Sequence, residues 1–206
     1  MSEIKEIKMA YLLWSTLAGT ISFFIGGVVG FIFLLRTDNY ILDTIIAGAI
    51  GGLLLGVFLR KQHKIGAMTI AGVVAVPVGF WASFGLGYAI SEIPFIVNSN
   101  IPDIWAIILM GAMVGALFKT IIYGRKSIWL FAVVGGVVSI ALGFLVNTLN
   151  SGQLDTLLNA LCVPHLGSLP FILSFGFGIG LSIGLYEMLK QRRIDSSTGR
   201  QNTSVM

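Results

Sequence analysis

The sequence predicts an all-α integral membrane protein, a polytopic transmembrane bundle of six helices. Composition, segment length and the placement of charge each support this fold class. Of the 206 residues, 56% are hydrophobic and 11% are charged, whereas soluble domains average roughly 45 to 50% apolar and about 25% charged residues. The chain therefore has too few charged residues to build a water-facing shell, and lipid is the expected surrounding of the bundle.

Six apolar segments are each long enough to cross a bilayer. About 20 residues are needed, because a helix rises about 1.5 Å per residue and the hydrocarbon core is about 30 Å thick. Runs such as IIAGAIGGLLLGVFL lack the period-2 alternation of barrel strands, so the segments are predicted to be helices. The predicted spans, within a membrane domain of residues 9–193, are 9–35, 40–59, 66–90, 104–123, 128–146 and 167–189.

The basic residues predict the orientation of these spans. Loops on the cytoplasmic side of membrane proteins are enriched in Lys and Arg, and here only Arg36 falls on the opposite side. The other twelve are Lys5, Lys8, Arg60, Lys61, Lys64, Lys119, Arg125, Lys126, Lys190, Arg192, Arg193 and Arg200. Both termini are thus expected in the cytoplasm and the protein in the plasma membrane, with residues 1–8 a short cytoplasmic segment and 194–206 a disordered tail. Because topology accounts for the net charge of +4, no nucleic-acid partner is expected.

Glycine spacing suggests three parallel helix-hairpin repeats, residues 9–64, 65–126 and 127–193. A GxxxG spacing recurs in the second helix of each pair as Gly48/Gly52, Gly111/Gly115 and Gly176/Gly180. Two glycines seven apart recur in the first helices as Gly19/Gly26, Gly72/Gly79 and Gly136/Gly143. Such small residues allow close packing of membrane helices, so these glycines are predicted to be packing positions. Chance recurrence among 26 glycines is the alternative to a true triplication.

Lys119 interrupts this pattern. It follows Gly115 by four residues, where the other two glycine rows continue with Gly56 and Gly184. Glu187 lies on the corresponding face of the last helix, so the two side chains are candidates for an ion pair and for a substrate or ion pathway. The alternative is that both side chains snorkel to the headgroups.

Asp43, just inside the outer end of the second span, is a third candidate for the pathway. Its carboxylate would pair with Arg36 or capture a cation. The alternative is a solvated carboxylate at the membrane interface.

No catalytic or cofactor-binding pattern is found in the sequence. HExxH and GxSxG motifs are absent, so no enzymatic activity is expected. Cys162 and His165 supply two potential ligands, whereas a metal site needs three or four, so neither a metal nor a cofactor is predicted.

Two functions fit a bundle with little mass outside the membrane. The first is a small-solute transporter or a substrate-binding permease subunit. Six helices with both ends inside are also the format of the substrate-binding subunits of vitamin-uptake transporters, which dock on an energising module through small residues of the first helix. The corresponding stripe here is Ser15, Gly19, Ser22, Gly26 and Gly30. The alternative is a non-transporting protein that acts through a membrane partner, a protective complex or a homo-oligomer.

Overall fold

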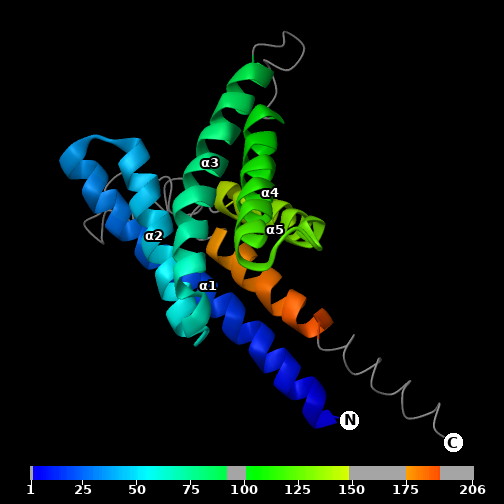
Figure 1. The fold of residues 1–206 in the computed structure, drawn as a ribbon. Helices are drawn as coiled ribbons and strands as arrows, with labels where there is room; N and C mark the ends of the chain where they lie inside the picture. Colours follow the sequence, from blue (N-terminus) through cyan, green and yellow to red (C-terminus); the bar gives the residue numbers. More distant parts are fainter. Residues whose placement is uncertain (1, 92–100, 149–174, 191–206) are drawn as a thin grey trace, which may run out of the picture.

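The computed structural model describes residues 2–91, 101–148 and 175–190, and these residues form helices joined by short turns (Figure 1). No strand occurs among them, so the all-α prediction is confirmed. The helices are α1 (Ser2–Thr37), α2 (Tyr40–Phe58), α3 (Ile65–Ser91), α4 (Ile101–Tyr123) and α5 (Ile128–Thr148), with a 3-10 turn η1 (Gln62–Lys64) between α2 and α3. Residues 175–190 form a further helix, called here the C-terminal helical segment.

Three described helices are long and apolar enough to cross a membrane. They cover Met9–Thr37, Tyr40–Phe58 and Gln62–Ser83, with mean hydropathies of 2.2, 2.1 and 1.8. Two shorter apolar helices, Ile108–Tyr123 and Ile128–Ala141, lie within the predicted fourth and fifth spans. The beginning of the predicted sixth span and the tail lie outside the described residues.

The outer surface of the bundle is apolar. Leu13 is 65% exposed, Ile70 58% and Trp129 67%, and many other large hydrophobic side chains are exposed on the same helices. A water-soluble monomer rarely exposes so much contiguous apolar surface. This exterior is therefore suited to lipid, in agreement with the lengths of the three apolar helices.

Short turns reverse the chain between neighbouring helices. Asn39 caps α2, because its side chain accepts hydrogen bonds from the backbone N–H groups of Ile41 and Leu42 at 3.1 Å each. Gly124 ends α4 with φ +76°, a left-handed conformation that costs a glycine least. The α2–α3 turn uses a left-handed Arg60 at φ +53°.

The glycines lie where helix backbones touch. A Cβ atom added to Gly48 would collide with the carbonyl oxygen of Gly72, and one added to Gly52 with that of Met68, so α2 packs backbone to backbone on α3. Gly111 and Gly115 of α4 meet Gly135 and Phe131 of α5 in the same way. These contacts, called here the glycine seams, bring backbones closer than side chains would permit.

A third seam joins the end of the chain to its beginning. Gly176 and Gly180 of the C-terminal helical segment meet Gly19 and Ser15 of α1, and the two helices run side by side in Figure 1. Each GxxxG thus contacts the first helix of the following pair, and the last contacts the first. Gly135, not Gly136, occupies the position equivalent to Gly19 and Gly72, because Gly136 has only ordinary contacts with α4.

The small-residue stripe of α1 is covered by the chain itself. Gly19 faces Gly176, Gly26 faces Ala47 of α2, and Gly30 faces Asp43. Ser15 and Ser22 are completely buried. The stripe of α1 thus packs against α2 and against the C-terminal helical segment of the same chain.

The glycine seams predict a large difference between two glycines of α3. Gly72→Ala should lower the free energy of unfolding by about 1 to 3 kcal/mol, because the new Cβ overlaps the backbone of Gly48 and forces the helices apart. Gly85→Ala is the matched control, because nothing lies within 4 Å of its Cβ position. Reversible unfolding in detergent micelles measures both, and equal stabilities would contradict the seam.

Candidate functional site

A charged cluster lies at the end of the bundle where α2 and α4 end and α3 and α5 begin. It is called here the lysine cluster, and its residues come from η1 and its N-cap, from α4 and from the C-terminal helical segment. Beneath it lies the apolar core, in which the rings of Phe23 and Phe118 meet edge to face at 6.1 Å. The members of the lysine cluster are Lys61, Lys64, Lys119, Tyr123, Tyr186 and Glu187.

Lys61 and Glu187 form the ion pair of the cluster. The Lys61 Nζ lies 2.5 Å from the Glu187 Oε1, and the two side chains are 16% and 24% exposed. The Tyr123 hydroxyl accepts a hydrogen bond from Lys61 at 3.0 Å and donates one to Glu187 at 3.4 Å. Burial by itself lowers the pKa of Lys61, but the hydrogen bonds to Glu187 and Tyr123 outweigh it and raise that pKa above its usual value. Lys61 is therefore held in its charged form.

Lys119 is completely buried. Its Nζ donates a hydrogen bond to the Gly124 carbonyl oxygen at 3.2 Å, an oxygen supplied by the turn that ends α4. The same ammonium lies 4.5 Å from the centroid of the Tyr186 ring and 5.2 Å from that of Tyr123, distances at which a cation is attracted to an aromatic face. In the structure the Lys119 side chain has no exposed surface, and its ammonium is turned toward this carbonyl and these rings.

The predicted ion pair between Lys119 and Glu187 is not formed in the part of the chain that the structure describes. Glu187 pairs with Lys61, whereas the ammonium of Lys119 contacts aromatic rings and the Gly124 carbonyl. The two residues nevertheless belong to the same cluster, because Tyr123 contacts both Glu187 and the ammonium of Lys119.

Lys64 completes the set of ammonium groups around Tyr123. Its Nζ lies 4.0 Å from the ring centroid, and that of Lys61 lies at 5.4 Å. Lys61 and Lys64 are partly buried, whereas Lys119 is completely buried. One ring therefore contacts three cations that come from η1, its N-cap and α4.

Asp43 lies apart from the lysine cluster, in the first turn of α2, whereas Lys61 follows the last turn. Its Oδ1 faces Gly30 of α1, and it is half-buried. Among the described residues it forms no ion pair with Arg36. The structure thus does not bring Asp43 together with Lys119 and Glu187.

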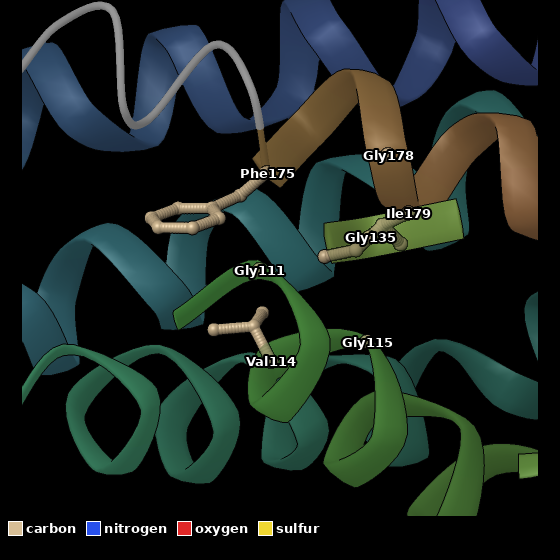
Figure 2. Close-up of a pocket in the computed structure, with 7 residues that line it drawn as sticks. All are labelled: Gly111, Val114, Gly115, Gly135, Phe175, Gly178 and Ile179. Atoms are coloured by element: carbon tan, nitrogen blue, oxygen red, sulfur yellow. The ribbon is translucent and has the colours of Figure 1, made fainter. Parts of the chain in front are cut away.

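The glycine seams enclose a small recess between α4, α5 and the C-terminal helical segment. Figure 2 shows its lining of glycine backbones with Val114, Phe175 and Ile179. Its glycines are Gly111, Gly115, Gly135 and Gly178. The recess has no room for a water molecule, so it is a packing defect and not a solute site.

No group of three or more His, Cys, Asp or Glu side chains gathers among the described residues. Cys162 and His165 lie outside the described residues. Comparison with known protein families, with characterised proteins and with solved structures gives no match.

Four members of the lysine cluster are not predicted as site residues from the sequence: Lys61, Lys64, Tyr123 and Tyr186. In the sequence, Lys61 and Lys64 belong to a basic loop that indicates topology, and Tyr123 and Tyr186 are ordinary aromatic residues near helix ends. The sequence signal for this site is the position of Lys119 in the glycine row, near the turn that follows α4. Nothing in the local sequence shows that the turn after α2 reaches the same place.

A double-mutant cycle tests the Lys61–Glu187 pair. Lys61→Met and Glu187→Gln should each destabilise the protein, because each leaves a partly buried charge without its partner. The double variant should lose less than the two single losses combined, with a coupling of about 1 kcal/mol in detergent unfolding. Lys126→Met, at an exposed position, is the control. Strict additivity would contradict the pair.

Proposed function

We propose that this protein is a small-solute transporter, or the substrate-binding subunit of a permease, built on six membrane-spanning helices. Both termini lie in the cytoplasm, and the membrane is the plasma membrane. The three apolar helices and the apolar exterior support membrane insertion. The charge bias supports the orientation, since the loops that carry nearly all Lys and Arg belong inside.

The glycine seams support an organisation in three parallel hairpin repeats. In each seam, GxxxG on the second helix of one pair meets the first helix of the next pair, and Gly19, Gly72 and Gly135 occupy equivalent positions. Repeats related by an axis along the membrane normal bring equivalent helix ends to one side of the bilayer. The lysine cluster then lies at the cytoplasmic end of the bundle.

The buried Lys119 is the observation that carries the transport proposal. Ionisable residues within membrane helices are costly, and they commonly line the path of a substrate or ion. Lys119 occupies a position at which the other two rows have glycine. To the residues that the structure describes, its ammonium makes one hydrogen bond of the three that it can donate.

A second candidate is a non-transporting membrane protein that acts through a partner protein or as a homo-oligomer. The observation in its favour is the recess between α4, α5 and the C-terminal helical segment, which is too narrow for water. Close packing of the helices at this recess suits a scaffold. Under this proposal the stoichiometric partner would be recovered by crosslinking, and Lys119 would affect stability alone.

Flux measurements separate the two candidates. Purified protein in liposomes should carry solutes from a metabolite panel, and Lys119→Met should reduce that flux by about tenfold or more, because the variant removes the buried charge. Lys126→Met removes a charge from an exposed position and should leave the flux unchanged. Equal flux in both variants would remove Lys119 from the pathway, and indifference to the whole panel would contradict transport.

A further inference from the structure

The lysine cluster has more positive than negative charge. Glu187 is its carboxylate, and that carboxylate is engaged by Lys61. Among the described residues, neither Lys64 nor Lys119 has a carboxylate within ion-pair distance. Three ammonium groups and one carboxylate leave two positive charges uncompensated. Lys190 is exposed near Glu187, where solvent screens its charge.

These charges are held in place by packing. The whole Lys119 side chain is enclosed, and its Nζ is fixed between the Gly124 carbonyl and the rings of Tyr123 and Tyr186. Lys64 lies against the same Tyr123 ring. Because burial removes solvent screening, the positive potential of the enclosed ammonium extends to the partly exposed Lys64.

We propose that the lysine cluster binds a phosphate group, with Lys64 as the direct contact and Lys119 as the buried source of positive potential. A phosphate monoester carries up to two negative charges, which match the uncompensated charge of the cluster. Lysine ammonium groups bind phosphate as point charges. Glu187 compensates the charge of Lys61, so the uncompensated charge of the cluster is that of Lys64 and Lys119.

Two sources can supply this phosphate group. In the orientation proposed above, the cluster lies at the level of the inner headgroups, so the phosphate of an anionic lipid reaches it from the side. A free phosphate or a phosphorylated solute reaches it from the cytoplasm. The inference rests on the proposed function in that the chain spans a bilayer in this orientation, and it does not require flux.

The test uses the full chain and two probes. In an uncharged detergent, inorganic phosphate is titrated against chloride at constant ionic strength, and the thermal unfolding midpoint is followed. In nanodiscs of phosphatidylcholine, the same midpoint is measured with and without phosphatidic acid. A ligand that binds only the folded state raises the midpoint as its concentration increases. Stabilisation by phosphate identifies a soluble ligand, and stabilisation by phosphatidic acid alone identifies a lipid.

The variants are Lys64→Gln, Lys119→Met and, as the control, Lys126→Gln. Lys64→Gln should raise the half-saturating concentration of the active probe by about tenfold or more, because one charged hydrogen bond is lost. Lys119→Met should weaken binding similarly, while Lys126→Gln should leave it unchanged. If Lys119→Met does not fold, Lys64→Gln decides the test, since its side chain is only partly buried.

The proposal is overturned if neither probe stabilises the protein, or if Lys64→Gln and Lys126→Gln respond alike. Its failure is distinct from failure of the transport proposal. Flux without any response to phosphate would refute the phosphate site alone. Phosphate binding without flux would refute transport and leave the site in place.

Discussion

Direct contact between helix backbones is the constraint on which this structure depends. In lipid, apolar side chains gain little by leaving their surroundings, so helices associate through close van der Waals contact. Gly48 and Gly72, Gly111 and Gly135, and Gly176 and Gly19 provide that contact at three equivalent places. Any side chain at these positions would overlap a carbonyl group of the facing helix. The glycines therefore fix both the spacing and the register of the helices.

The lysine cluster is a consequence of that register. Two glycine rows continue toward the end of the bundle, with Gly56 against Ile65 and Gly184 against Leu12. In α4 the same row ends in Lys119. A glycine at this position would leave room for a neighbouring helix, whereas the Lys119 side chain fills that space itself. Tyr123, Phe131 and Tyr186 surround the ammonium at ring-centroid distances of 4.5 to 5.9 Å. Aromatic faces and one carbonyl thus replace the water that a lysine ordinarily binds.

The helices could be predicted from the sequence more fully than the contacts between them. The apolar runs over α1, α2 and α3 are long enough to predict the helices from length alone, and the turns after Thr37 and Tyr123 follow the predicted span ends. The GxxxG pairs were expected to lie between helices, but their partners were not, because a glycine row does not specify which neighbour it faces. The register at Gly135 shows the same limit, since Gly135 and Gly136 are indistinguishable by spacing alone.

Only part of the candidate site could be predicted, because the sequence pattern does not specify which helices and turns meet. Lys119 was singled out by its place in a glycine row, and Glu187 by its helix face. The two side chains do not pair in the structure, because the Lys119 ammonium lies against aromatic rings and the Gly124 carbonyl. Lys61 takes Glu187 instead, after a turn in which Arg60 adopts a left-handed conformation that the local sequence does not predict.

Covalent labelling of lysines tests most directly whether Lys119 is enclosed by the protein. The intact protein, in micelles and in bilayers, is treated with an amine-reactive reagent at neutral pH, and modification at each lysine is measured by mass spectrometry. The structure predicts that Lys126 and Lys190 react readily, whereas Lys119 reacts only after unfolding. Modification of Lys119 at the rate of Lys126 in the folded protein would contradict the enclosed lysine and the cluster built around it.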